Sequence, residues 1–560
     1  MTDLSGIASL EGSGLKGAAP PGRVPAPRGS RRDPRRTAPR GRVSGRAWLL
    51  VWALVLGWSL WSFLDGGHGV LNPAGLPSFG EFWAAAARPE LSRDVLVTTL
   101  EASATTLAFG VLGTLLSVVL GILVAPFMSQ TWWAPGSASG PARVVRAGGL
   151  LLARAAVALP RGVHEAVWGL LLVSVLGRDP LVGVLAIAVP FGAITAKVFS
   201  ELLDEADRGP YDLLREAGAG RVAALSYGLL PSLLPGATSY AFYRFECSIR
   251  SAVILGMIGA GGLGLQLTLA FQGLQYGRMW TCIYALLVLG AVIDRWGAYL
   301  RRGTSRRRWP LSGAVAALLA AGSVWHLAPD LERWFSARTA DRLSRLVDDL
   351  VPPSLPAGGW SELGAAAVET LQMSVVAITL AAVLGLLVAL VAARGSGSRP
   401  RRALGWVARQ LLLLTRAVPP PVWALLVLFV VFPGPLPGAI ALGVYTFGIL
   451  GRLFAEVVEE LDQRPREALT ELGAPPAASF AYASVPAAAG QLIALSLYRW
   501  EVTARETVVV GVVGAGGLGS LLEQQRAGFD YPAMATTVLA LVAVCLVVDA
   551  LSVAVRASLR

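Results

Sequence analysis

Two stretches of the chain carry charged and phenolic side chains in the same order and at the same spacing. The candidate site residues in them are Tyr243, Arg244, Glu246, Arg250, Tyr498, Arg499, Glu501 and Arg505. Guanidinium groups donate paired hydrogen bonds to phosphate-like oxygens, so this pattern favours the binding of an oxyanion. Four arginines against two glutamates leave a surplus of two positive charges for such an anion. The tyrosine hydroxyls would add hydrogen-bond donors.

The same residues also allow a purely structural interpretation. Glu246 and Arg250 are four residues apart, as are Glu501 and Arg505, so each pair can share a helix face and form an ion pair. An unpaired arginine near the centre of a bilayer costs about 3 kcal/mol. Ion networks that brace the helices therefore stay open as an alternative to an anion pathway.

The composition around these stretches is that of a membrane protein. Of 560 residues, 54% are hydrophobic and 15% are charged, and the mean hydropathy is +0.59. Soluble domains carry about 25% charged residues, so soluble-enzyme, fibrous and disordered classes are excluded. The net charge of +12 then indicates cytoplasmic loops rather than a nucleic-acid surface, because basic residues collect on the inner side of membrane spans.

The N-terminal segment differs from the rest of the chain. Residues 1–46 are rich in Gly, Pro and Arg and carry +7 of the net charge. Such a segment cannot bury enough apolar surface to fold, so we expect a disordered cytoplasmic arm, with anionic lipid as a candidate contact. The apolar run Ala47–Leu64 lacks a cleavage signal and predicts a retained first membrane helix.

Apolar runs of membrane length predict about twelve spans in an all-α protein. They lie near 47–64, 94–125, 147–176, 180–199, 236–266, 279–298, 310–327, 366–393, 404–432, 436–455, 490–519 and 534–555. Arginine clusters in alternate connections place both termini in the cytoplasm and the segments 65–92 and 328–365 outside.

The chain repeats itself. Residues 243–264 and 498–519 are identical at twelve of twenty-two positions, at an offset of 255 that extends back to Arg161 and Arg416. Upstream, Thr99-Leu100 resembles Thr370-Leu371, which suggests an offset of 271 there. We therefore expect two parallel six-helix units, 47–305 and 306–560, with a cavity between them, as in many transporters.

A glycine motif ends each repeated stretch. Its glycines are Gly259, Gly261, Gly262 and Gly264, with Gly514, Gly516, Gly517 and Gly519 in the second copy. A dinucleotide site would require a preceding strand, whereas this motif ends an apolar run of membrane length. Close helix packing and a gate or bend that faces the substrate both remain open.

A polar insert lies between the fourth and fifth spans of each half, near 200–235 and 456–490. Its spacing resembles the EAA loop of ABC-importer permeases, and the matching positions are Asp212, Gly218, Pro231, Glu467, Ala468, Gly473 and Pro486. The first copy departs from the pattern, with Asp for Glu and Leu for Ala. The resemblance implies a short cytoplasmic helix that docks on an ATPase; an ordinary amphipathic loop helix is the alternative.

The wider pattern is similar to the phosphonate-type ABC permease (PhnE) family. The shared segments are Tyr243–Gly264, Tyr498–Gly519 and Arg161–Trp168 with Arg416–Trp423. The resemblance implies a type I ABC importer (MetI-like) fold in a bacterial inner membrane, with two permease units joined in one chain. It also implies two cytoplasmic ATPase subunits that bind ATP and Mg, an extracytoplasmic binding protein, and phosphonate, phosphite or phosphate as cargo.

No catalytic or metal site is expected in this chain. Neither Lys16 nor Lys197 follows a glycine, so a P-loop is excluded. Cysteines and histidines are too scattered for a metal site, and the acidic residues near Glu201 and Glu456 favour a solvated helix face or an ATPase contact. Arg161 and Arg416 favour a place at the cytoplasmic interface over anion contact. An ABC permease for methionine, a metal or an osmolyte, or an ion-driven carrier, remains the alternative function.

Overall fold

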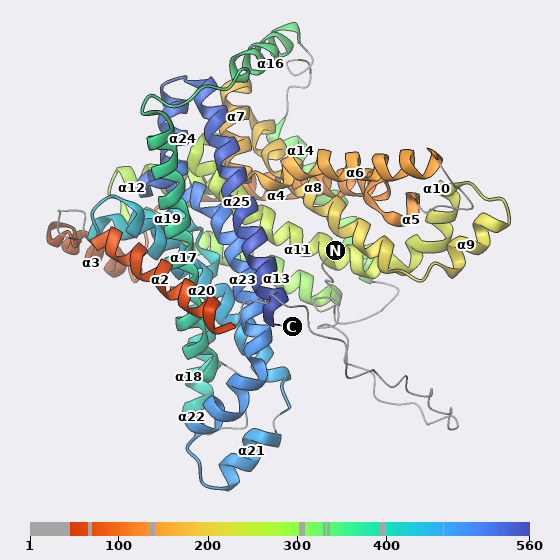
Figure 1. Ribbon diagram of the computed structural model, residues 1–560. Coiled ribbons are helices and arrows are strands. Elements are labelled where there is room, and N and C mark those ends of the chain that lie inside the picture. Colours follow the sequence, from red (N-terminus) through yellow and green to blue (C-terminus); the bar gives the residue numbers. More distant parts are fainter. Residues whose placement is uncertain are drawn as a thin grey trace. The chain divides into compact units, whose positions relative to one another are not determined.

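The computed structural model describes residues 45–559 except 65–69, 134–140, 178, 302–307, 329–331, 333–335, 393–398 and 463. The arm predicted for residues 1–46 lies outside this described part, apart from its last two residues. The described residues form helices (Figure 1), and among them the only β-type pairing is an isolated bridge between Leu71 and Val431. Gly45–Arg560 is one compact unit.

The helices of the first half and of the second half follow the same order. The first half contains α2 (Gly45–Leu64), α3 (Leu76–Ala85), α4 (Arg93–Met128), α5 (Gln130–Trp133), α6 (Pro141–Gly162), α7 (Glu165–Leu176), α8 (Pro180–Glu205), α9 (Gly209–Glu216), α10 (Arg221–Ala224), α11 (Leu230–Leu255), α12 (Gly262–Gln272) and α13 (Tyr276–Arg301). The second half contains α14 (Arg308–Leu327), α16 (Ala337–Leu350), α17 (Gly359–Ala392), α18 (Arg399–Ala417), α19 (Pro420–Val430), α20 (Pro435–Glu460), α21 (Arg464–Glu471), α22 (Pro476–Ser479), α23 (Val485–Val510), α24 (Gly517–Ala527) and α25 (Tyr531–Leu559). This order confirms the duplication.

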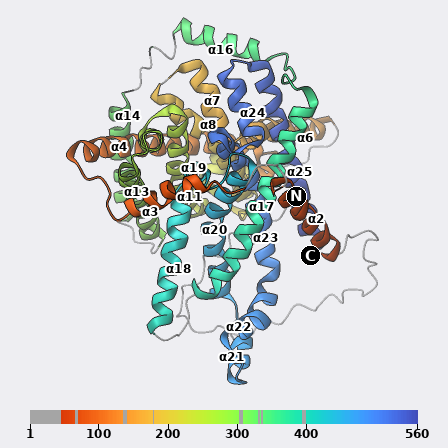
Figure 2. The same ribbon diagram turned by 90° about the vertical axis from the view of Figure 1, so that its left-hand side faces the viewer.

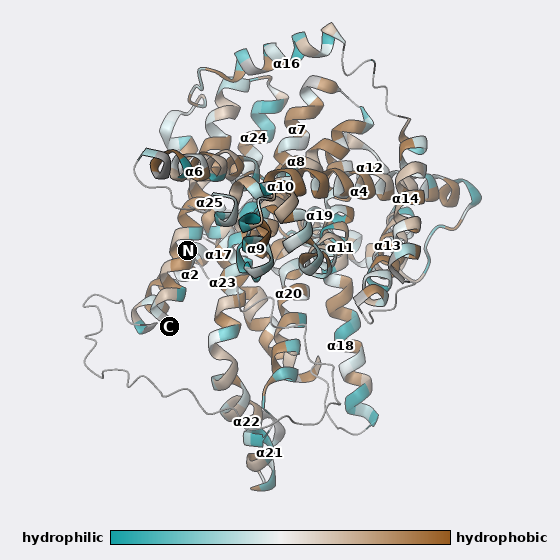
Figure 3. Ribbon diagram, turned by 90° about the vertical axis from the view of Figure 1, so that its right-hand side faces the viewer, coloured by the Kyte–Doolittle hydropathy of each residue, from teal (hydrophilic) through white to brown (hydrophobic). Residues whose placement is uncertain are grey.

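Nine helices of the described part are long and apolar enough to cross a membrane, and three bent helix pairs raise the number to twelve if each pair is one span. In Figure 3 much of the ribbon of these helices is brown, the colour of hydrophobic residues. Two predicted continuous spans, 147–176 and 404–432, are instead helix pairs bent by 83° and 98°. In the second pair, the bend follows from Pro419 and Pro420, which cannot continue the hydrogen-bond ladder of α18.

The structure corrects the predicted register of α4 against α17. Thr106 accepts a hydrogen bond from the backbone N–H of Leu263, and Thr370 accepts one from Leu518, both at 2.9 Å. The equivalent threonines are therefore 264 positions apart, and the offset of 271 is wrong. Gly121 and Gly385, also 264 apart, pack against equivalent residues of α8 and α20.

The first helix of each half packs against the other half. Helix α2 contacts α17 and α25, and Trp52 donates a hydrogen bond from Nε1 to Thr379 Oγ1 at 3.0 Å. Helix α14 contacts α4 and α13 in the same way. Figures 1 and 2 both show α2 beside α17. The two halves are thus held together by exchanged helices.

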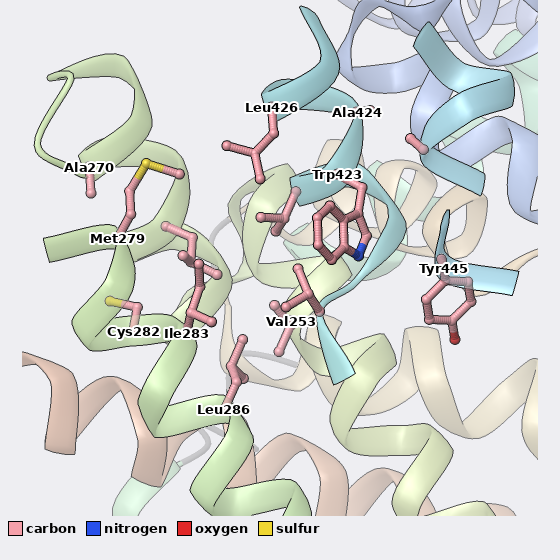
Figure 4. Close-up of a cluster of buried hydrophobic side chains, with 14 of the residues drawn as sticks. Val253, Ala270, Met279, Cys282, Ile283, Leu286, Trp423, Ala424, Leu426 and Tyr445 are labelled. Atoms are coloured by element: carbon pink, nitrogen blue, oxygen red, sulfur yellow. The ribbon is translucent and has the colours of Figure 1, made fainter. Parts of the chain in front are cut away.

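The short helices α7 and α19 also cross between the halves. In the largest buried cluster, Trp423 and Leu426 of α19 pack against Met279 and Ile283 of α13 (Figure 4). Equivalent contacts join Val167 of α7 to helices of the second half. The core therefore lies between the halves, which positions α11 and α23 close to each other.

Candidate functional site

The predicted tyrosines and arginines lie near the middle of α11 and at the equivalent positions of α23. Tyr243 lies beside Arg244, whose guanidinium carbon is 5.6 Å from the centre of the Tyr243 ring. The guanidinium carbon of Arg499 lies 5.9 Å from the ring centre of Tyr445 of α20, and Arg250 bonds to the hydroxyl of the same tyrosine. The surfaces of Tyr243 and Tyr498 are 48% and 42% exposed. Arg250 of the first half and Arg499 of the second thus meet at one tyrosine ring, and of the predicted residues here Tyr243 and Tyr498 are the exposed ones.

Glu246 belongs to an ion network on one side of this group. It lies 3.4 Å from Arg250, as the spacing predicts, and 3.4 Å from Arg416 of the second half. Arg416 also contacts Asp294 of α13 at 3.1 Å. These four side chains line a cavity of about 50 Å³ between α11, α13 and α18. With two arginines and two carboxylates, the network is balanced in charge.

In the second half the equivalent glutamate and arginine, Glu501 and Arg505, form ion pairs with other residues. The predicted pair of Glu501 and Arg505 is not formed: Arg505 lies 3.5 Å from Asp549, and Glu501 lies 2.6 Å from Arg556. Both partners belong to α25, whose last turns run beside α23 and compete for these side chains. Sequence reasoning missed Asp294 and Asp549, although they are equivalent positions 255 apart within apolar spans.

The two central arginines have different surroundings. Arg499 is 8% exposed and forms an ion pair with Glu506 at 3.2 Å. Arg244 instead donates from Nε to the Tyr240 hydroxyl at 2.7 Å. Its guanidinium carbon lies 4.9 Å from the Phe191 ring centre and 5.6 Å from that of Tyr243. Cation–π contacts of this kind stabilise a positive charge without neutralising it.

These pairings change the expected charge balance. Among the four predicted pathway arginines, three have a carboxylate partner, and Arg244 has none among the described residues. Tyr445 of α20, which was not predicted, accepts a hydrogen bond from Arg250 at 3.1 Å. Arg416 contacts Glu246 and Asp294 of the other half, whereas its predicted place at the cytoplasmic interface stays a prediction.

The glycine motif breaks the helix after α11 and after α23. Gly259 and Gly514 have φ angles of 109° and 100°, in the region that only glycine adopts easily. The last glycines lie against backbone: a Cβ at Gly264 would overlap the Val253 carbonyl, and one at Gly519 the Val508 carbonyl. Both glycine motifs therefore combine close packing with a bend.

The polar inserts form the short helices predicted for them. Helix α9 contains Asp212 and ends before Gly218, and α21 contains Glu467 and Ala468 and ends before Gly473. Both glycines have a φ of 87°, and the following residue donates back to Leu214 or Leu469, which closes each helix with a C-terminal cap. Pro231 and Pro486 lie at the starts of α11 and α23.

Exposed apolar side chains accompany these helices. Tyr227 and Tyr482, equivalent positions 255 apart, are 80% and 79% exposed, and Leu472 is exposed as well. Figure 1 shows α9–α10 and α21–α22 at two separate extremities of the unit. A surface of this kind is typical of a docking site for another protein.

The acidic residues that precede the inserts are partly structural. Asp204 accepts hydrogen bonds from Ser129 and Thr131 at the start of α5 and lies 3.9 Å from Arg154. Glu459 pairs with Arg409 of α18 at 2.9 Å. These residues therefore tie α8 and α20 to their neighbours.

Comparison with protein families identifies two copies of one domain. Residues 117–306 and 358–560 each match the binding-protein-dependent transport system inner membrane component. The two matches fall in the two structural halves.

Individual relatives have related names. The chain is 30% identical over 467 residues to the phosphate-import permease protein PhnE of Mycolicibacterium smegmatis, covering 81% of this chain and 84% of that protein. It is 34% identical over 214 residues to the phosphite transport system permease protein PtxC of Stutzerimonas stutzeri, covering 38% of this chain and 76% of that protein. No solved structure matches.

Proposed function

Because the chain belongs to the family of binding-protein-dependent transport system inner membrane components, we propose that it is the complete channel of an ATP-driven importer for a small phosphorus oxyanion. The family members are multi-pass permease subunits of ABC importers. Two such domains in one chain supply both halves of a channel that other members build from two chains.

The cargo is proposed from the relative that spans both halves, whose name specifies phosphate import. Relatives that match shorter parts of the chain are named for phosphite and phosphonate transport. An arginine without a carboxylate partner, in an aromatic setting near the middle of α11, supports an anionic cargo of this class. Phosphate, phosphite and phosphonates therefore define the substrate class.

Energy would come from two copies of a cytoplasmic ATPase that bind ATP and Mg. One copy would dock on α9 and Tyr227, and the other on α21 and Tyr482. Each short helix is capped by a glycine and followed by a proline at the start of the next span, so it can transmit a displacement as a rigid element. An extracytoplasmic binding protein would deliver the anion at the opposite side, with both termini in the cytoplasm of a bacterial cell.

Uptake of labelled phosphate, phosphite and phosphonates in cells that lack their own importers tests this proposal. We expect uptake only when the chain and its ATPase are produced together. The double variant Tyr227→Glu/Tyr482→Glu should reduce ATPase co-purification about tenfold or more, because it places charge on two exposed apolar contacts. Phe529→Glu, an equally exposed aromatic outside the inserts, is the control. Uptake that persists without the ATPase would instead indicate an ion-driven carrier.

A further inference from the structure

The two halves of the anion pathway are not equivalent, although their sequences repeat. Arg244 and Arg499 occupy the same position in α11 and α23, 255 residues apart. Seven residues further along, the first half has Ser251 and the second has Glu506. Arg499 extends to Glu506 at 3.2 Å, so its charge is neutralised within its own helix.

Arg244 extends in the opposite direction along its helix. Its Nε bonds to Tyr240, four residues earlier, and its guanidinium lies over three rings, those of Phe191, Tyr240 and Tyr243, at 4.9, 5.2 and 5.6 Å. In the second half the equivalents of Phe191 and Tyr240 are Thr446 and Leu495, and among the described residues Arg499 lies over a single ring, that of Tyr445, at 5.9 Å.

The hydrogen-bonding edge of Arg244 remains free. Its terminal nitrogens Nη1 and Nη2 bond to none of the residues that the structure describes, and they are not sealed from solvent. Stacking on aromatic faces leaves these in-plane donors available, and their geometry fits two oxygens of one oxyanion. Tyr243, half exposed beside them, carries a hydroxyl that makes no hydrogen bond with a described residue.

Ser251, the equivalent of Glu506, already has a hydrogen-bond partner. Its hydroxyl donates to Glu165 of α7 at 2.6 Å, and both side chains are buried. Glu165 has no counterpart in the second half, where the position is Pro420. In the first half the buried carboxylate, Glu165, thus lies on α7 and binds Ser251. In the second half the carboxylate, Glu506, binds Arg499 directly.

We propose that the channel holds a single, one-sided oxyanion subsite, in which Arg244 with Tyr243 and Tyr240 binds the anion while Arg499 is a structural cation. The inference rests on the proposed function and deepens it. The repeat predicts equivalent anion contacts in both halves, whereas this subsite has its anion contact in the first half alone.

The test compares Arg244→Gln with Arg499→Gln/Glu506→Gln, which removes the second guanidinium without leaving its carboxylate unpaired. Phosphate uptake is measured in cells that produce the full transporter. Phosphate binding is measured on the full-length chain in lipid nanodiscs, as the shift in thermal midpoint at constant ionic strength. Arg244→Gln should lower the uptake rate and raise the half-effective phosphate concentration, each about tenfold or more. The double variant should stay within about twofold of wild type.

Arg244→Lys, with Arg499→Lys as its control, serves if Arg244→Gln fails to assemble. Lysine keeps the charge but lacks the planar fork, so Arg244→Lys should weaken phosphate binding several-fold and Arg499→Lys should not. Equal effects at both positions, or wild-type binding in both Arg244 variants, would overturn the one-sided subsite. If wild-type cells take up no phosphorus oxyanion, the proposed cargo is wrong, while the nanodisc titration still decides whether Arg244 binds phosphate.

Discussion

Charged side chains inside the spans are stabilised mostly by residues of other helices. Arg416 of α18 contacts Glu246 of α11 and Asp294 of α13, so one guanidinium joins the second half to two helices of the first. All three side chains are mostly buried, and a partner lost from such a group leaves an uncompensated charge in a medium that solvates it poorly.

Arg416→Gln should therefore destabilise the folded protein by about 2 kcal/mol, because Asp294 loses its ion-pair partner. Arg161→Gln is the matched control: Arg161 is the equivalent residue of the first half and makes no ion pair with a described residue. We expect it to cost less than about 1 kcal/mol. Thermal unfolding of both variants in detergent measures the difference. Equal midpoints would show that the Arg416 network does not hold the halves together.

For single residues, the sequence predicts the charged positions of the site better than it predicts their ion-pair partners. The repeat identifies all four arginines, and the spacing of Glu246 and Arg250 predicts a pair that forms. The same spacing fails for Glu501 and Arg505, because Asp549 and Arg556 approach from α25. Helix periodicity describes neighbours along one helix, and it contains nothing about a helix that packs from outside.

At the level of elements, the glycine motif shows how a backbone contact can fix a break between helices. Gly264 lies near the start of α12, and a Cβ at this position would overlap the carbonyl of Val253 near the end of α11. Gly259 lies at the break itself, where a Cβ would meet no atom within 4 Å but the φ angle is 109°. One glycine is thus required for its size and the other for its backbone conformation.

This distinction predicts different results for two alanine variants. Gly264→Ala should cost about 3 kcal/mol or more and strongly reduce the yield of folded protein, because backbone cannot move aside for the methyl group. Gly259→Ala should cost only about 1–2 kcal/mol, the strain of its φ angle. Gly364→Ala, a glycine of α17 with nothing within 4 Å, is the control. The three variants are compared by their yield of folded protein after size-exclusion chromatography. A normal yield of Gly264→Ala would contradict the close packing of Gly264 against the Val253 carbonyl.

The sequence alone does not determine which residue of α4 is equivalent to which residue of α17. Both helices are long apolar runs in which Thr-Leu pairs recur, so several alignments match a few residues. The register is fixed by small side chains at contacts: Gly121 against Thr195 and Gly385 against Gly451. Contacts between helices, rather than composition along one helix, select the offset of 264.

For the molecule as a whole, the exchange of first helices explains why two units in one chain need not be two separate folding units. Helix α2 belongs to the first half in sequence but packs on α17 and α25, and α14 packs on α4 and α13. The sequence predicts that these helices exist, because their apolar length is sufficient. It contains no signal for their partners, since a helix that is apolar all round fits many surfaces in a membrane.

The exchange predicts that the chain can be divided between residues 305 and 306 without losing its structure. When a tagged fragment 1–305 and an untagged fragment 306–560 are produced together, they should co-purify, because α2, α14, α7 and α19 each bury apolar surface on the other half. A first fragment that begins at residue 70 lacks α2 and with it the hydrogen bond from Trp52 to Thr379. We expect it to retain several-fold less of the second fragment. Fragments that purify separately as stable proteins would show that the exchanged helices contribute little to assembly.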